Sequence, residues 1–340
     1  MTSERSASSP TPTLEMVAAL AGVSRSTVSR VVNSSPRVAP DVIQSVNEAI
    51  DTLGYVPNRA ARSLASKRTH SIALVIPENT AKFFADPYFA SVIQGAAMYL
   101  STTEYTLTLL IASETDPDKT RRYLQGGNVD GALILSHHSD DRSYAQLARR
   151  IPVVFGGRPM SQEGTDNYIV DVDNVSASAR ATRYLIDHGR KRIATIAGPQ
   201  NMAAGIDRVE GWRNAVAAAA LDADLIEYGD FTPAGGAEAM RRLLDRGEHF
   251  DGLFAASAQM ASGALAVLRE RGLEVPKDVG ITTIDNDYYA QNSTPPLTTI
   301  DQPSSVQGEM IAKILVRLID GQEVEKLTII PTELIERESV

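Results

Sequence analysis

The sequence predicts a small all-helical headpiece followed by a larger α/β body of two lobes, each with a doubly wound parallel sheet. Apolar residues recur with helical spacing in three short segments before residue 55. From Ser71 onward, strand-like apolar runs alternate with helical segments, a pattern typical of parallel sheets covered by helices. About 270 residues of this alternation exceed what one lobe normally holds, so we expect two lobes.

The three headpiece helices are bounded by residues that favour helix ends. The first follows Thr13, whose hydroxyl can cap it, and ends before Gly22, which tolerates the positive φ of a tight turn. The second begins after Ser24, and the third runs from Pro40 to Gly54. The apolar face of the first helix consists of Leu14, Val17, Ala18 and Ala21.

The second helix separates a polar face from an apolar one. At about 100° per residue, its polar sector spans about 140°. The polar sector contains Arg25, Ser26, Ser29, Arg30 and Asn33, whereas Val28, Val31 and Val32 lie outside it. Arginine can pair with guanine in the major groove, and Ser or Asn can reach base edges or phosphates. A solvated helix of an ordinary bundle is the alternative, but the turn glycine and helix cap favour a DNA-binding helix-turn-helix.

The charge distribution agrees with DNA binding at one end of the chain. Residues 1–70 contain eight Lys and Arg against five Asp and Glu, a net charge of +3, whereas the whole chain carries −9. The remainder therefore carries −12. We expect a basic head to attract phosphates while the acidic body repels DNA.

Composition and motifs exclude several other classes of protein. The chain has no cysteine, which excludes disulfides and thiolate chemistry and suits a reducing cytoplasm. Residues 1–12 are predicted to be a disordered tail rather than a signal peptide, and no run approaches the roughly 20 apolar residues of a membrane helix. His137 and His138 are adjacent rather than spaced for one helical face, so we expect a surface loop rather than a metal site. We find no nucleotide-binding or hydrolase motif, and we expect neither an enzyme nor a cofactor.

Parallel two-lobed folds bind ligands in the cleft at the carboxyl ends of their strands. Arg158 and Asp285 each follow a predicted strand and are candidates for that cleft. A transported-solute binding protein would share such a body, but it would carry a signal peptide and no helix-turn-helix.

Three motifs resemble those of the lactose/galactose repressor (LacI/GalR) family. They are TLEMVAALAGVSRSTVSRVVN (13–33), GYVPNRA (54–60) and PPLTTI (295–300), and the resemblance extends from Thr13 to Glu338. It implies that Arg25, Ser26 and Arg30 read bases. It also implies a set of further DNA contacts, mostly to phosphates: Thr13, Leu14, Ser24, Thr27, Ser29, Asn33, Tyr55, Asn58 and Arg59. Met16 departs from the family, which usually has an acidic residue there.

The segment NRAARSLASKR (58–68) has four positive charges and no negative one. By composition it could be a plain linker. The resemblance instead implies a hinge helix that becomes ordered when a homodimer meets a near-palindromic, double-stranded operator. In that arrangement Leu64 wedges into the minor groove and Ala61 lies beside the bases. The chain lacks a C-terminal leucine heptad, which argues against a coiled-coil tetramer.

The resemblance makes the body a sensor like the periplasmic sugar-binding proteins, with a small, sugar-like effector between its lobes. It implies that Arg208 and Asp285 bind ligand oxygens and that Phe89 lies against the ligand, although Phe89 could equally be core. Ser257-Ala258 replaces the family's usual Asn-Asp pair. Ser257 can still hydrogen-bond, which keeps it a candidate contact, but Ala258 cannot. The departure weakens the case for a simple monosaccharide as the effector. Whether the effector releases DNA or promotes its binding stays open.

We expect the chain to be divided into five parts: a tail (1–12), a helix-turn-helix domain (13–57), a hinge (58–69), an N-terminal lobe (70–171 and 301–328) and a C-terminal lobe (172–300 and 329–340).

Overall fold

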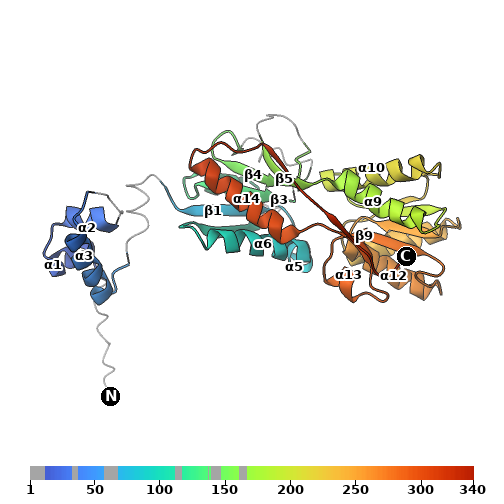
Figure 1. Cartoon of the computed structure of the whole chain (residues 1–340), viewed down its shortest axis with the longest axis horizontal. Coiled ribbons are helices and arrows are strands. Elements are labelled where there is room, and N and C mark those ends of the chain that lie inside the picture. The colour runs from blue at the N-terminus through green and yellow to red at the C-terminus, as the bar shows by residue number, and fades with distance from the viewer. Residues whose placement is uncertain are drawn as a thin grey trace, which may run out of the picture. The chain divides into compact units, whose positions relative to one another are not determined.

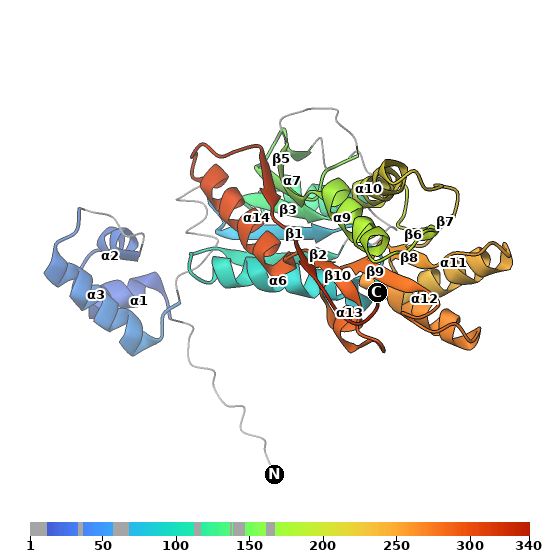
Figure 2. The ribbon, with the colours of Figure 1, turned by 45° about the vertical axis from the view of Figure 1, so that its right-hand side comes forward.

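The computed structural model describes residues 12–32, 37–56, 68–111, 117–136, 138, 147–160 and 167–340. The chain divides into two compact units, Met1–Thr69 and His70–Val340. Figures 1 and 2 show the helical first unit and the two α/β lobes of the second. The predicted boundaries at residues 12 and 57 stay predictions, because most of the tail and of the linker lies outside the described residues.

The first unit contains the three predicted helices, α1 (Leu14–Leu20), α2 (Arg25–Val32) and α3 (Pro40–Leu53). Thr13 caps α1, since its Oγ1 accepts a hydrogen bond of 3.3 Å from the Met16 amide. Ser24 caps α2 in the same way, accepting from the Thr27 amide at 3.2 Å. Gly54 ends α3 with φ +60°, a left-handed conformation that glycine adopts readily. The buried core of this unit comprises Val17, Ala18, Val28, Val46, Ala49 and Tyr55.

The N-terminal lobe of the second unit is a six-stranded sheet in the order β11-β5-β4-β3-β1-β2, and all its pairs are parallel. Its strands are β1 (Ser71–Ile76), β2 (Thr106–Ile111), β3 (Gly131–Leu135), β4 (Val153–Gly156), β5 (Tyr168–Val172) and β11 (Leu327–Ile330). Its helices are α5 (Thr80–Ala85), α6 (Pro87–Leu100), α7 (Pro117–Gln125) and α14 (Ser304–Ile319). Alternate strand residues form two cores, one beneath α6 and α14 and the other on the side of α7. The sheet is therefore covered on both faces, as the apolar strand runs predicted.

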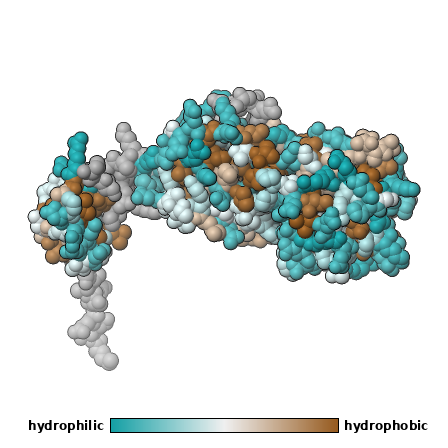
Figure 3. Space-filling model, in the orientation of Figure 1, coloured by the Kyte–Doolittle hydropathy of each residue, from teal (hydrophilic) through white to brown (hydrophobic). Residues whose placement is uncertain are grey.

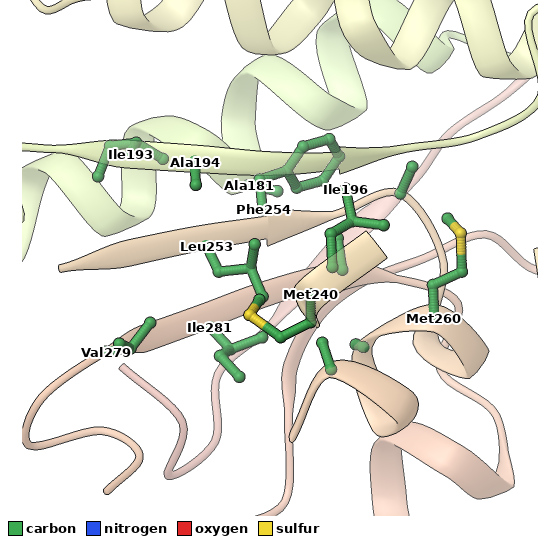
Figure 4. Close-up of a cluster of buried hydrophobic side chains, with 14 of the residues drawn as sticks. Ala181, Ile193, Ala194, Ile196, Met240, Leu253, Phe254, Met260, Val279 and Ile281 are labelled. Carbon is green, nitrogen blue, oxygen red and sulfur yellow. The ribbon is translucent and has the colours of Figure 1, made fainter. Parts of the chain in front are cut away.

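The C-terminal lobe repeats this plan with the strand order β12-β10-β9-β8-β6-β7, in which only β12 is antiparallel. Its strands are β6 (Ile193–Ala197), β7 (Ile226–Tyr228), β8 (Gly252–Ala255), β9 (Gly280–Ile284), β10 (Thr298–Asp301) and β12 (Glu333–Ile335). Helices α9 (Asn174–Asp187) and α10 (Ala203–Ala218) pack together, as do α11 (Pro233–Asp245) and α12 (Ala258–Glu270), and α13 (Tyr288–Asn292) precedes β10. Figure 4 shows the apolar side chains between sheet and helices, including Leu253, Phe254 and Ile281.

The chain crosses between the two lobes three times, after β5, after β10 and after β11. The predicted lobe boundary at residue 328 is wrong by two residues, because Ile329 and Ile330 continue the parallel ladder with β5. The boundaries at 171 and 300 are each one residue early, since Val172 pairs with Ile330 and Asp301 pairs with Glu333. Strand pairing decides these limits, and an apolar run does not reveal its partner strand.

Among the described residues, none of the helices combines the length and apolar composition needed to span a membrane.

Helices α6 and α14 lie side by side over the N-terminal lobe (Figure 1) because glycines remove side chains from their contact. A Cβ at Gly308 would lie 2.0 Å from the Val92 carbonyl oxygen, and one at Gly95 would lie 1.8 Å from the Ser305 carbonyl oxygen. Both obstacles are backbone atoms, which cannot rotate away. These two glycines therefore set the distance between the helices.

We predict that Gly308→Ala destabilises the body, although alanine is the better helix former. The clash of Cβ with the Val92 backbone should outweigh the gain in helix propensity and cost about 1–3 kcal/mol of unfolding free energy. Denaturant unfolding measures this change. Lys313→Ala on the exposed side of α14 is the matched control, expected within about 0.5 kcal/mol of wild type. A more stable Gly308→Ala protein would contradict the close approach.

Candidate functional site

A cavity lies between the two lobes of the second unit, at the carboxyl ends of strands from both sheets. It encloses about 860 Å³, part of which is open to solvent. The five predicted effector contacts all line it: Phe89, Arg158, Arg208, Ser257 and Asp285. The fold thus brings together residues that lie up to 196 positions apart in the sequence, from Phe89 to Asp285.

Arg208, on α10, is 5% exposed and is held by three hydrogen bonds. Its Nε donates to Asn174 Oδ1 at 2.9 Å, Nη1 to the Ala256 carbonyl at 2.6 Å and Nη2 to Gln302 Oε1 at 3.2 Å. The guanidinium carbon lies 5.6 Å from the centroid of the Phe231 ring. A guanidinium has five N–H groups, so two remain available to a ligand in the cavity. Arg208 is therefore an oriented donor.

Asp285 is the corresponding acceptor, directly after β9. Its carboxylate accepts hydrogen bonds from Gln302 Nε2 and from the Ala258 backbone amide at the start of α12. Burial raises the pKa of this carboxyl, while Arg208 and the hydrogen bonds oppose the increase. Asp285 has φ +83°, a left-handed conformation that is strained for a residue with a Cβ. Such strain concentrates at functional sites.

Ser257 and Ala258, which stand where the family usually has Asn-Asp, both form hydrogen bonds at the cavity wall. The Ser257 hydroxyl caps α12 by accepting from the Met260 amide at 3.3 Å. Ala258 contributes its backbone amide to Asp285, so this point of the cavity remains polar. The next residue, Gln259, is 4% exposed and hydrogen-bonds to Asp86 of the N-terminal lobe. Gln259 is thus a cavity residue that the motif comparison missed.

Phe89 and Arg158 serve the fold as well as the cavity. Phe89 is 3% exposed and packs 5.5 Å from Phe83, centroid to centroid, so it belongs to the core, and it also lines the cavity. Arg158 Nη2 lies 2.6 Å from Asp207 Oδ1 on α10. This ion pair joins the two lobes beside the cavity.

A second polar cluster lies at the N-terminal-lobe side of the cavity and was not predicted. Glu78, between β1 and α5, is 4% exposed. Its Oε1 accepts hydrogen bonds from Lys82 Nζ at 3.1 Å, Ser136 Oγ at 2.5 Å and His138 Nε2 at 2.9 Å. His138 lies outside the helices and strands, as expected for a loop, but its side chain is 24% exposed and bound to a buried carboxylate. His137 lies outside the described residues.

Burial by itself would raise the pKa of Glu78. The hydrogen bond from His138, the charge of Lys82 and the Ser136 hydroxyl outweigh this effect and lower the pKa to about 2. In turn, the hydrogen bond to Glu78 raises the pKa of His138. Glu78 is therefore ionised at any physiological pH.

Sequence inspection also missed Asn174, Phe231 and Gln302, which surround Arg208. Glu78 and Ser136 had a usable signal, since each follows an apolar strand as Asp285 does. Asn174 and Gln302 offered the same signal, since they follow β5 and β10, whereas Phe231 lies three residues beyond β7. A Cβ on Gly198, at the end of β6, would lie 2.3 Å from Phe231 Cζ, so the ring position depends on that glycine.

In the first unit, the predicted base-reading residues Arg25, Ser26 and Arg30 are exposed on α2. Arg25 Nε lies 3.1 Å from Glu15 Oε1, an exposed ion pair that a phosphate or base could replace. Tyr55 is only 9% exposed and belongs to the headpiece core. Five predicted DNA contacts lie outside the described residues: Asn33, Asn58, Arg59, Ala61 and Leu64.

Carboxyl groups crowd together where the chain crosses between the lobes. Burial and then the charge of Asp285 raise the pKa of Asp287 to about 7 and that of Asp86 to about 6. Burial and then Asp285 also raise the pKa of Asp301. Among the described residues, no three His, Asp or Glu side chains are arranged to hold a metal ion.

We predict that Asp287→Asn flattens the pH dependence of the body's stability. A carboxyl whose folded-state pKa is raised stabilises the fold fully below about pH 4 and loses that contribution as the pH rises through the folded value. Asn retains an oxygen for the Tyr289 and Ala290 amides that Asp287 caps. Between pH 5 and pH 8 the wild type should lose about 2 kcal/mol more unfolding free energy than the variant. Equal losses in denaturant titrations would contradict the raised pKa.

Comparison with known proteins agrees with both units. A model of bacterial regulatory proteins of the lacI family matches residues 13–58, and one of a periplasmic binding protein-like domain matches residues 182–340. The HTH-type transcriptional regulator CelR of Thermobifida fusca is 45% identical over 333 residues, covering 96% of this chain and 98% of that protein.

Two solved structures extend the comparison to the fold. A transcriptional regulator CelR-cellobiose complex has 43% identity and a TM-score of 0.77, covering 97% of this chain and 100% of that one. A lac repressor dimer bound to operator and the anti-inducer ONPF has 25% identity and a TM-score of 0.84, covering 96% and 98%. The predicted headpiece and two-lobed sensor are confirmed. The chain belongs to the LacI family of ligand-regulated, DNA-binding transcriptional regulators, which are not enzymes.

Proposed function

We propose that this regulator is a cytoplasmic repressor that binds operator DNA as a homodimer and responds to a glucose disaccharide, cellobiose, in the interlobe cavity. The observation that carries the proposal is the oriented pair of Arg208 and Asp285 at the cavity wall. One supplies N–H donors and the other accepts, which together match vicinal sugar hydroxyls. The similarity to CelR, one structure of which contains cellobiose, supports this choice of sugar.

The charge of the cavity favours a neutral ligand. Four carboxylates and three basic groups line its described part: Glu78, Asp86, Asp171 and Asp285, with Lys82, Arg158 and Arg208. A phosphorylated ligand would bring a further negative charge close to these carboxylates, which are poorly screened by water. The ring of Phe231 offers an apolar surface against which a pyranose ring can pack.

The body also presents a surface for a second copy of the chain. Figure 3 shows apolar side chains gathered over the N-terminal lobe. On the edge strand β11 of that lobe, Leu327 and Ile329 are 55% and 48% exposed. Exposed apolar groups of this kind usually mark an interface. The similar lac repressor is a dimer on its operator, and two heads double the number of base pairs that are read.

Ligand control requires that the two lobes respond to the ligand. The lobes are joined by the Arg158–Asp207 ion pair and by the Asp86–Gln259 hydrogen bond, both beside the cavity. A ligand that favours this arrangement shifts DNA affinity only by the difference in its affinity for the two body conformations.

We expect cellobiose to change operator affinity at least tenfold and Arg208→Lys to abolish this response while operator binding is retained. Lysine keeps the positive charge but not the several fixed N–H donors. Operator DNA is first selected from a random duplex library by the purified chain, and fluorescence anisotropy then measures its affinity with and without cellobiose. Maltose serves as the control sugar. An operator affinity that ignores cellobiose would contradict the proposed effector.

We also predict that Arg25→Ala reduces the preference for the selected operator over random DNA by about 10- to 100-fold. A bidentate arginine–guanine contact contributes about 1–3 kcal/mol of base discrimination. Arg37, an exposed arginine outside α2, provides the control, because Arg37→Ala should weaken both kinds of DNA binding alike. Unchanged preference in the Arg25 variant would show that α2 does not read the operator.

A further inference from the structure

The described hydrogen bonds to the buried carboxylate of Glu78 reach only one of its two oxygens. The Lys82, Ser136 and His138 donors all converge on Oε1. Among the described residues, none donates to Oε2, although Glu78 lines the cavity and is 4% exposed. A carboxylate has two oxygens, and each can accept hydrogen bonds from hydroxyl groups. A ligand hydroxyl in the cavity could therefore donate to Oε2.

The cluster holds Glu78 in one orientation. Asn79 caps α5 by accepting from the Lys82 amide at 2.8 Å, which places the lysine beside Glu78. Ser136, directly after β3, has φ +53° and is therefore strained, as are Phe231 at +66° and Asp285 at +83°. These three left-handed residues line the same cavity, Ser136 from one lobe and the other two from the opposite lobe.

The cavity therefore has two polar ends. Arg208 and Asp285, on α10 and after β9, form the C-terminal-lobe end, while Glu78 and Ser136, after β1 and β3, form the N-terminal-lobe end. The two groups share none of the described hydrogen bonds. His138 also hydrogen-bonds to Asn201 of the C-terminal lobe, so the Glu78 end is completed where the lobes meet.

We infer that Glu78 is the residue that selects a disaccharide over a monosaccharide, by accepting hydroxyl hydrogen bonds from the second sugar ring through Oε2. This inference rests on the proposed sugar effector. One ring binds Arg208 and Asp285, and the other reaches the acceptor in the opposite lobe. Lys82, Ser136 and His138 position that acceptor by occupying Oε1.

Isothermal titration calorimetry of the full-length chain with cellobiose and with glucose tests this assignment. The wild type should bind cellobiose more tightly than glucose. Glu78→Ala should weaken cellobiose binding by about 10- to 100-fold, the range expected for hydrogen bonds to a charged group, and change glucose binding less than threefold. Glu78→Gln, which keeps the shape but lacks the charge, should fall between the two.

Glucose binding by the Glu78 variants also reports that the cavity is folded. Glu104→Ala is the matched control, because Glu104 is an exposed glutamate of the same lobe, 78% exposed at its side chain. Equal weakening of both sugars, or unchanged cellobiose binding in Glu78→Ala, would overturn the role of Glu78 and leave the proposed function standing. If the wild type binds neither sugar, the proposed function fails and this inference fails with it.

Discussion

The buried guanidinium of Arg208 is the group on which the cavity depends. A buried cation is tolerated only when it is paired and hydrogen-bonded. Arg208 meets this requirement through Asn174 on α9, the carbonyl after β8 and Gln302 after β10. Three segments that are distant in sequence are thus held around one side chain. The same side chain lines the cavity between the lobes.

Parallel sheets explain why this cavity collects polar groups from so many segments. The carboxyl ends of parallel strands meet at one edge, and the loops that leave them face the opposite lobe. Ser136 and Asp285 occupy such positions in the two lobes, and both adopt strained left-handed backbones. With three crossings between the lobes, their relative position can change while each sheet stays intact.

Much of the architecture could be predicted from local patterns. Thr13 and Ser24 cap helices because their hydroxyls reach the backbone amides three residues ahead, a rule that needs no tertiary contact. The parallel strands were visible as apolar runs because they are buried on both faces. Arg158 and Asp285 could be nominated because each follows a strand. Short elements such as β7 and α13 are hard to predict, since a few residues carry too little periodicity.

The sequence by itself determined the helix caps, the exposed arginine face of α2, the alternation of strands and helices, and the family motifs. These features depend on residues close together in the chain. Only the tertiary structure decided that Glu78 gathers Lys82, Ser136 and His138, that Gln259 bonds across the lobes, and that β11 ends at Ile330. Such pairings depend on which strands become neighbours and on how closely helices approach. A buried carboxylate and an exposed one look the same in a sequence, and only packing around them distinguishes the two.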